Sequence, residues 1–519
     1  MLLFKNLTHN SDRNKLFLLL TASFLVRSLV AANIDLSNDE VNYWAYALYP
    51  SLSHFDHPPM VGYIIQLFTL NLTFQSEFFI RAASLVIGTI NTYIIFLIGK
   101  RLFDINTGLT AAILYTGSVY CSVILGLFIL PDTPLSLFWL LTFYFALVIV
   151  PQKNPDNRKR KLFLLLGVFI GLGMISKYTA AFLWIGIIAY ILFVNRSWLK
   201  TREFYLSIML SVLLFLPVII WNFQNDFISF TFQSERVSLS ESKLRFDFLG
   251  TELAGQIFYN NPINFVVIIL SLIALFKKKL SFQKDYAVLL LLWSLPIIFV
   301  FLFSSLTRRT LPHWSAPGYY GLIIIAAVFL SSNSKNKVHI SAKLSVLLIT
   351  IVILLGFIQI KTGVLYNDLK DRSSINLGEN DASLDLFGWH QLSEEFSKIY
   401  KKDLTNNRIT PNPYIITWRW FPAANYDYYI GNSAGVFSYA IGGLENIRNY
   451  FWINRKRIPP VIGSDAYFIC SSRDYNLPSK FYSEYFTEFE TADTIRIIRN
   501  NLNVMNYFVF RMKGLSKKP

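Results

Sequence analysis

The chain has 519 residues, of which 53% are hydrophobic and only 15% are charged. So few charges cannot cover the surface of a water-soluble protein of this size. The formal net charge of +16 could indicate nucleic-acid binding, but Lys and Arg are spread through short loops between apolar segments. Composition therefore excludes an ordinary soluble protein and favours a protein embedded in the lipid bilayer. The spread of the basic residues argues against nucleic acid as a partner.

Apolar windows of about 18 or more residues, the length that crosses a hydrocarbon core about 30 Å thick, recur through the first 360 positions. The first, residues 16–34, lacks a small-residue cleavage site and is expected to be a retained helix, with the Arg27 side chain reaching outward to the membrane surface. The later runs are residues 78–99, 107–130, 134–150, 162–194, 204–221, 257–276, 286–305, 317–331 and 344–360.

The run from 162 to 194 is too long for one crossing, and Lys177 near its middle would place a charge at the bilayer centre. If two short helices meet at Lys177 instead, most Lys and Arg residues of the short loops fall on one side of the membrane. The positive-inside rule then predicts about eleven transmembrane helices, with a cytoplasmic N-terminus and a multi-pass location in the cell inner (plasma) membrane.

The sequence becomes mixed and polar after residue 361. A helix-like stretch (389–401) and strand-like stretches (414–418, 466–471 and 494–499) predict a small α/β domain. We therefore expect a polytopic α-helical membrane domain over residues 1–361 and an extracytoplasmic α/β domain over 362–519. No internal repeat is found, which disfavours a transporter built from inverted repeats.

The first outer loop contains the segment Asp35–Tyr49, whose apolar residues recur at helical spacing and predict an amphipathic helix along the membrane surface. Ser37 and Glu40 fit a capping box, and acidic residues suit a first helical turn for purely structural reasons. That explanation accounts for Glu40 better than for Asp39. Asp39 is therefore the candidate catalytic base, with Glu40 and Tyr43 as candidate sugar or acceptor contacts.

Asp56 and His57 precede Pro58 and Pro59, which can open a helix. An anion would find free backbone N–H groups at such a helix start. His57 is accordingly a candidate ligand of a donor phosphate, and Asp56 a candidate sugar or acceptor contact. The structural alternative is an Asp cap beside an exposed histidine.

Four further residues on the outer side offer charges. Asp132, a candidate sugar or acceptor contact, has a structural alternative as the N-cap of the fourth crossing. Lys177 could bind a lipid phosphate, and snorkelling of its side chain is the alternative. Arg308 and Arg309 add donors for the same phosphate, although a solvated loop would explain them equally.

These residues belong to short motifs that resemble the bacterial GT-C glycosyltransferases related to protein O-mannosyltransferases and lipid A aminoarabinose transferases. The resemblance covers nearly the whole membrane portion and touches the C-terminal part. The motifs are Asp39-Glu40 with Tyr43-Trp44, Phe55-Asp-His-Pro-Pro59, Pro131-Asp132, Ser176-Lys-Tyr178, Trp221-Asn222, Pro312-His-Trp-Ser-Ala-Pro317, Gly388-Trp389 and Ile447-Arg-Asn-Tyr-Phe-Trp452.

The resemblance implies an inverting transferase that takes a sugar from an undecaprenyl-phosphate type of carrier. The acceptor would be extracytoplasmic: lipid A or another glycolipid, a polysaccharide, or a protein hydroxyl. It also implies that Asp39 acts as base, and it adds His313 as a candidate sugar or acceptor contact. No cofactor is expected, because Asp39, Asp56 and Asp132 lack the compact spacing of metal ligands. A bound divalent ion stays an open alternative. The competing function is a transporter, flippase or lipid-headgroup-binding protein without transfer chemistry.

Overall fold

The computed structural model describes residues 10–237, 244–333, 338–369 and 372–519. The chain forms two compact units. A helical unit comprises the chain up to Ala31 and the segment Pro50–Ile353, and a mixed unit comprises Ala32–Tyr49 and Leu354–Pro519. The first outer loop is thus part of the same unit as the C-terminal α/β sequence.

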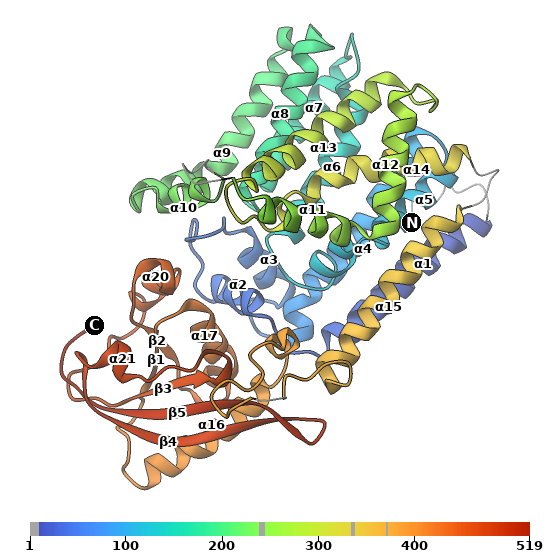
Figure 1. The fold of residues 1–519 in the computed structure, drawn as a ribbon. Helices are drawn as coiled ribbons and strands as arrows, with labels where there is room; N and C mark the ends of the chain where they lie inside the picture. Colours follow the sequence, from blue (N-terminus) through green and yellow to red (C-terminus); the bar gives the residue numbers. More distant parts are fainter. Residues whose placement is uncertain (1–9, 238–243, 334–337, 370–371) are drawn as a thin grey trace. The chain divides into compact units, whose positions relative to one another are not determined.

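The helical unit contains one long bundle of apolar helices (Figure 1). Its helices are α1 (Asn10–Ala31), α3 (Met60–Phe68), α4 (Glu77–Leu102), α5 (Ile105–Thr116), α6 (Asp132–Ile149), α7 (Asn157–Met174), α8 (Ala181–Phe193), α9 (Arg202–Gln224), α10 (Ile228–Val237), α11 (Phe246–Asn260), α12 (Pro262–Phe276), α13 (Lys284–Ser304), α14 (Tyr319–Ser332) and α15 (Ile340–Thr362), the last of which continues into the mixed unit. Short π or 3-10 turns are Tyr120–Ile124, Tyr178–Ala180, Arg196–Lys200, Pro312–Trp314 and Ala316–Gly318.

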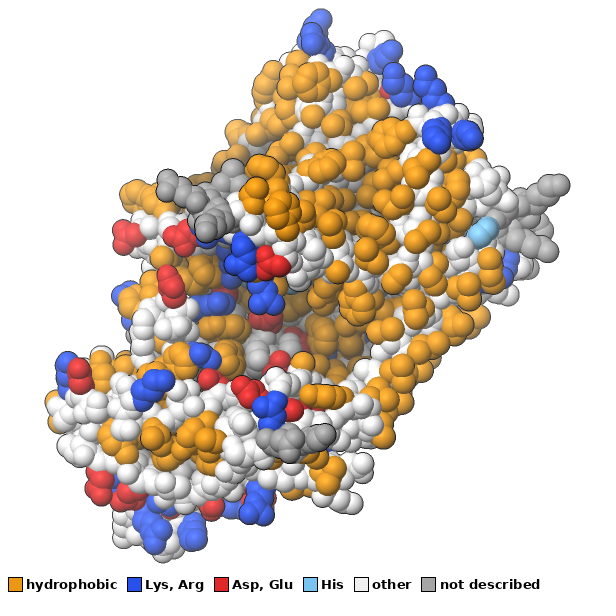
Figure 2. Space-filling model, viewed as in Figure 1, with side chains coloured by type: hydrophobic (Ala, Val, Ile, Leu, Met, Phe, Trp, Pro, Cys, Tyr) orange, Lys and Arg blue, Asp and Glu red, His pale blue; other side chains and the backbone are white. Residues whose placement is uncertain are grey.

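Within the described residues, 6 helices are long and apolar enough to cross a membrane, or up to 7 if the pair α11 and α12, bent by 99°, forms one span. Tyr178–Phe193 and Ala316–Ser332 are shorter apolar helices. On the helical unit, Figure 2 shows a broad hydrophobic surface with Lys and Arg side chains gathered at one end. The predicted multi-pass membrane protein is confirmed, whereas the number of about eleven crossings stays a prediction.

The predicted break at Lys177 is confirmed, because α7 ends at Met174 and α8 begins at Ala181. The apolar run 107–130, in contrast, is not one helix. Helix α5 ends at Thr116, and a short π-helix follows at Tyr120–Ile124. The Gly117 carbonyl accepts a hydrogen bond from Asn261 Nδ2 at 2.9 Å, which gives this helix end a partner that local sequence periodicity does not reveal.

Arg27 does not reach outward, and that expectation was wrong. Its side chain is 4% exposed and donates to the Ser23 carbonyl at 3.0 Å and to Thr89 Oγ1 at 3.2 Å. Gly88 and Gly126 line the space occupied by its guanidinium, and a Cβ at either position would collide with Arg27 Nη1. The charge stays inside because these partners satisfy its donors there.

The mixed unit contains a five-stranded sheet in the order β2-β1-β3-β5-β4, and Figure 1 shows β3, β5 and β4 side by side. Strand β1 pairs in parallel with β2 and β3, whereas β5 pairs antiparallel with β3 and β4. In register, Ile415 lies opposite Ser438 and Tyr467, and Phe468 lies opposite Phe510. The strands are β1 (Tyr414–Thr417), β2 (Ser438–Ala440), β3 (Ala466–Ser471), β4 (Phe486–Arg499) and β5 (Leu502–Leu515).

Helix α16 (Trp389–Thr405) packs on β4 of this sheet. The predicted helix 389–401 and the three predicted strands therefore coincide with α16, β1, β3 and the end of β4, and the predicted α/β character is confirmed. The remaining helices are α2 (Asn38–Leu48), α17 (Trp420–Asn425), α18 (Asn432–Ala434), α19 (Leu444–Ile447), α20 (Tyr450–Asn454) and α21 (Ser479–Tyr482), with π or 3-10 turns at Tyr426–Gly431, Ala382–Leu386 and Ser472–Asp474.

The capping box predicted for the first outer loop is present at α2. The Ser37 backbone N–H donates to Glu40 Oε2 at 2.9 Å, and the Glu40 N–H donates to Ser37 Oγ at 3.4 Å. The residues from Glu40 to Ala47 are buried, so the apolar face of this helix packs against protein, and its position along the membrane surface stays a prediction. Trp44, for example, packs edge to face on Tyr428 at a centroid distance of 5.1 Å.

The Gly388-Trp389 motif joins the segment before α2 to the rest of the mixed unit. The Trp389 N–H donates to Asp35 Oδ2 at 2.9 Å, and the Trp389 ring stacks on Tyr429 at 6.0 Å. Gly388 has φ +98°, and a Cβ there would collide with Ile497. A glycine is required at this turn because the backbone is left-handed and the space is filled.

Candidate active site

A cavity of about 230 Å³ lies in the helical unit and collects candidate residues from distant parts of the sequence. The loop before α3, the junction between α7 and α8, the helices α10 and α13, and the turn Pro312–Trp314 each supply part of its wall. The lining residues are His57, Lys177, Tyr178, Thr179, Phe182, Gln233, Arg236, Val300, Phe301 and Trp314.

Lys177 lies at the break between α7 and α8 and forms a buried ion pair with Asp132. Its Nζ is 2.9 Å from Asp132 Oδ1 and 2.8 Å from Oδ2, and the two residues are 7% and 3% exposed. Tyr120 OH donates a third hydrogen bond to Asp132 Oδ1 at 2.8 Å. The snorkelling alternative for Lys177 is therefore excluded, and Asp132 makes no cap bond at the start of α6.

The loop that carries His57 is held by backbone contacts on both sides. The Met60 N–H donates to the Ile175 carbonyl at 3.1 Å. From α10, Ser229 Oγ donates to the His54 carbonyl at 2.8 Å, and Gln233 Nε2 donates to the Asp56 carbonyl at 2.5 Å. These bonds place His57 on the cavity wall next to the α7–α8 break. Helix α3 begins at Met60, just after the two prolines.

Burial is the largest of the effects that together lower the pKa of His57 to about 4. The positive charges of Lys177 and Arg236 act in the same direction, and Asp56 and Asp132 oppose them. His57 is therefore a neutral imidazole at pH 7 in this cavity. It can approach an anion as an N–H donor, and not as the pH-dependent cation that its ordinary pKa would give.

Arg236 on α10 lines the cavity and is not among the site residues predicted from the sequence. Its guanidinium lies over Trp314 at 5.5 Å and over Phe232 at 4.1 Å, where the ring faces attract a cation. A signal was available, because Ser229, Gln233 and Arg236 recur at i, i+4 and i+7 on one helix face. The first two bind the His57 loop, so the third lies on the face turned toward the cavity.

The other candidates of the helical unit do not line this cavity. His313 adjoins Trp314, and burial together with the charge of Lys177 lowers its pKa to about 4. Asp56 is buried beside His57. Arg308, half-buried, and Arg309, exposed, follow α13 but are absent from the cavity wall.

A buried network fixes the segment that carries His313 and Trp314. Thr310 Oγ1 donates to Glu252 Oε2 at 2.7 Å, and Gln256 Nε2 donates to Glu252 Oε1 at 2.9 Å. Tyr319 OH then donates to Gln256 Oε1 at 2.5 Å. Glu252 is 1% exposed, so a carboxylate on α11 holds the chain on both sides of the Pro312–Trp314 turn. Sequence reasoning did not single out Glu252.

Asp39, Glu40 and Tyr43 belong to α2 in the mixed unit. Asp39 is exposed, whereas Glu40 is completely buried with its carboxylate occupied by the capping box. Tyr43 is 5% exposed and packs on Tyr46. The two acidic neighbours therefore differ: Glu40 forms the predicted capping box, and the Asp39 side chain is exposed.

The cavity combines basic and apolar walls. Among its described lining residues, Lys177 and Arg236 carry positive charge, His57 offers a ring nitrogen, and no acidic side chain is present. Phe182, Val300 and Phe301 form the apolar part of the wall. Such a site suits a small anion attached to an apolar chain.

The buried pair between Lys177 and Asp132 predicts a coupled effect on stability. Lys177→Ala and Asp132→Asn each leave one polar or charged partner buried without its counterpart, and each is expected to destabilise the protein by about 3–5 kcal/mol. The double variant removes both charges and is expected to recover part of that loss. Thermal unfolding of the four proteins in the same detergent measures the coupling, and additive losses would contradict the pair.

Comparison with known proteins finds similarity in sequence and in fold. Residues 56–221 match the family described as dolichyl-phosphate-mannose-protein mannosyltransferase. The chain is 21% identical over 323 residues to the lipid A galacturonosyltransferase RgtD of Rhizobium johnstonii. That match covers 60% of this chain and 65% of RgtD, slightly less than two thirds of the relative's length.

The fold is similar to that of ArnT from Cupriavidus metallidurans. The apo crystal structure matches with a TM-score of 0.62 at 12% identity, over 97% of this chain and 98% of ArnT. The structure bound to undecaprenyl phosphate matches with a TM-score of 0.60 at 14% identity, over 95% and 97% of the two chains. The resemblance to GT-C glycosyltransferases that the sequence motifs predicted is therefore confirmed.

Proposed function

We propose that this protein is an inverting glycosyltransferase that moves a sugar from an undecaprenyl-phosphate type of donor to an acceptor outside the cytoplasm. The observation that carries the proposal is the basic cavity lined by Lys177, His57 and Arg236 beside an apolar wall. Support comes from ArnT, which has been crystallised with undecaprenyl phosphate, and from RgtD, whose described acceptor is lipid A.

In this reaction an acceptor oxygen attacks the anomeric carbon while the bond from that carbon to the carrier phosphate breaks. The carrier leaves as a phosphate anion, so cations placed at the phosphate stabilise the transition state. Lys177 and Arg236 supply the charge, and neutral His57 supplies an N–H donor. If the acceptor is a hydroxyl, Asp39 removes its proton as the new bond forms. If the acceptor is a phosphate, no strong base is needed, and Asp39 instead orients the reactants or stabilises charge.

We assign the protein to the cell inner membrane, with the membrane domain over residues 1–361 and the extracytoplasmic domain over 362–519. Lipid, glycan and protein hydroxyl acceptors all fit this orientation. The partners are then the bilayer, the lipid-linked donor and one such acceptor. The loops that carry Asp39, Asp132, Lys177 and Arg308 lie on the non-cytoplasmic side in this arrangement, since the opposite loops hold most of the Lys and Arg residues.

Reporter fusions test this orientation. Fusions after Pro155, Lys200 and Leu280 are expected to report a cytoplasmic location, and a fusion after Leu365 a non-cytoplasmic one, because the basic loops stay inside. An alkaline phosphatase and a fluorescent reporter at each position give opposite readouts. The reverse pattern at these four positions would remove the proposed site from the side where the acceptor is expected.

Donor binding tests the phosphate ligands. Lys177→Ala and Arg236→Ala are each expected to weaken binding of undecaprenyl phosphate roughly tenfold to hundredfold, because each removes one charge-assisted hydrogen bond. Arg308→Ala and Arg309→Ala are expected to have smaller effects, since neither residue lines the cavity. Binding is measured with the purified proteins in nanodiscs.

Arg202→Ala is the matched control, because Arg202 is an exposed arginine in the first turn of α9. The Lys177→Ala/Asp132→Asn double variant separates binding from folding, since it loses the cation without leaving a buried charge. Unchanged binding by Lys177→Ala and by the double variant would contradict the assignment of Lys177.

The role of Asp39 separates an enzyme from a transporter, a flippase or a headgroup-binding protein. Asp39→Asn keeps the side-chain size but removes the basicity, and loss of a general base typically lowers the rate by about 10² to 10⁴. We expect this variant to bind donor lipid normally and to show no measurable transfer to a hydroxyl acceptor. Glu40→Gln, the neighbouring control, should act mainly on stability because Glu40 forms the capping box. Transfer at the wild-type rate by Asp39→Asn would falsify the base assignment.

A further inference from the structure

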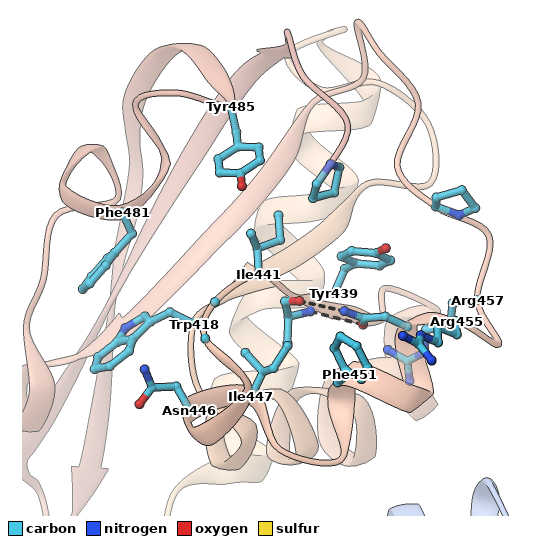
Figure 3. Close-up of a pocket in the computed structure, with 16 residues that line it drawn as sticks. Trp418, Tyr439, Ile441, Asn446, Ile447, Phe451, Arg455, Arg457, Phe481 and Tyr485 are labelled. Carbon is cyan, nitrogen blue, oxygen red and sulfur yellow. Dashed lines mark hydrogen bonds between the residues drawn. The ribbon is translucent and has the colours of Figure 1, made fainter. Parts of the chain in front are cut away.

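A second, larger cavity lies entirely within the mixed unit. Its volume is about 760 Å³, within the range of roughly 300–1,000 Å³ typical of sites for small molecules. Figure 3 shows it between the loop after β2, helix α20, and the segment with Phe481 and Tyr485. None of the residues that line it belongs to the site described above.

Aromatic rings form much of the cavity wall. Tyr439, Phe451, Phe481 and Tyr485 all line it, and Figure 3 shows these rings around one hollow. Trp418 lies at one edge of the cavity. Its ring stacks on Phe481 at a centroid distance of 4.9 Å, and the Arg419 guanidinium lies over the same ring, 3.6 Å from its centroid. Rings of this kind pack against apolar C–H groups and leave polar groups of a ligand free to bond elsewhere.

The two arginines of the cavity have different tasks. The Arg457 side chain is 7% exposed and is paired with Asp427, with Nη2 and Oδ2 2.6 Å apart. Arg455 is exposed and lies over the Phe451 ring at 4.1 Å. In the part of the chain that the structure describes, Arg455 has no acidic partner and no acidic side chain lines the cavity. An oriented guanidinium of this kind is suited to a phosphate or carboxylate.

A buried hydrogen-bond network keeps the floor of the cavity rigid. Asp427 accepts from Tyr450 OH at 2.6 Å and from the Ser438 N–H at 2.7 Å. Asn454 Nδ2 donates to the Ala440 carbonyl at 2.7 Å. Strand β2 and helix α20 are thereby fixed to each other. The Ile447–Trp452 motif, which the proposed chemistry does not use, thus supplies one wall of the cavity through Ile447 and Phe451.

We propose that this cavity binds a saccharide that carries a phosphate or carboxylate group, as the recognition site for a glycan acceptor. Aromatic rings match the C–H faces of sugar rings, exposed Asn446 offers an amide for hydroxyls, and Arg455 supplies the charge for the anionic group. As an account of the acceptor, this inference rests on the proposed glycosyl transfer. The binding itself does not depend on that chemistry.

Binding of three soluble probes tests the inference on the full-length protein in nanodiscs, without donor. The probes are a glucosamine disaccharide with phosphates at both ends, the same disaccharide without phosphates, and inorganic phosphate. The phosphorylated disaccharide is expected to bind most tightly, and Arg455→Ala to weaken it roughly tenfold or more, the loss typical of one charge-assisted hydrogen bond. Phe451→Leu should weaken both disaccharides, because it removes a ring from the wall.

Arg408→Ala is the control, since Arg408 is an exposed arginine of the same unit outside the cavity. Equal binding by Arg455→Ala and the unaltered protein would overturn the inference, as would inorganic phosphate binding as tightly as the phosphorylated disaccharide. The Lys177→Ala/Asp132→Asn double variant separates the two proposals, because it should weaken donor binding and retain saccharide binding. A protein that transfers sugar but binds neither disaccharide would overturn only the present inference.

Discussion

The buried pair between Lys177 and Asp132 is the interaction on which the helical unit is organised. Two charges among apolar helices are tolerated only when each satisfies the other, and the remaining acceptor capacity of Asp132 is met by Tyr120. The pair joins the start of α6 to the α7–α8 break. The break leaves Lys177 in an extended backbone conformation. Its side chain therefore points toward Asp132, and does not take the direction that a residue of a continuous helix would have.

The cavity follows from where that break lies. The Ile175 carbonyl, freed at the end of α7, accepts the N–H of Met60 and so brings the His57 loop beside Lys177. Helix α10 binds the same loop through Ser229 and Gln233 and adds Arg236. The basic wall is thus assembled from three segments that are far apart in the sequence. The His57 loop is bonded to the end of α7 by backbone atoms and to α10 by the Ser229 and Gln233 side chains, so hydrogen bonds hold the segments that carry the basic residues.

The parts that the sequence predicted well depend on local signals. The break at Lys177 follows from length and charge, the α2 capping box from two residues three positions apart, and strand β3 from a short apolar run. The parts that it missed depend on contacts between distant residues. The burial of α2, the inward position of Arg27 and the role of Glu252 each depend on a partner that no local pattern identifies. Of the candidate site, His57, Lys177 and Asp132 do come together, whereas Arg308 and Arg309 do not reach the cavity.

The low pKa of His57 bears on how such a cavity can receive a phosphate. Before a ligand arrives, Asp132 balances the charge of Lys177 and His57 is neutral, so the cavity is less positive than its residue types suggest. A phosphate bound beside the imidazole would shift the His57 pKa upward from about 4, and a ring that is still neutral would donate its N–H to the anion. The same anion competes with Asp132 for the Lys177 ammonium. Both effects arise only when the anion is present. Without the anion, the cavity avoids the free-energy cost of several unpaired buried cations, and the same side chains still offer hydrogen-bond donors to a ligand.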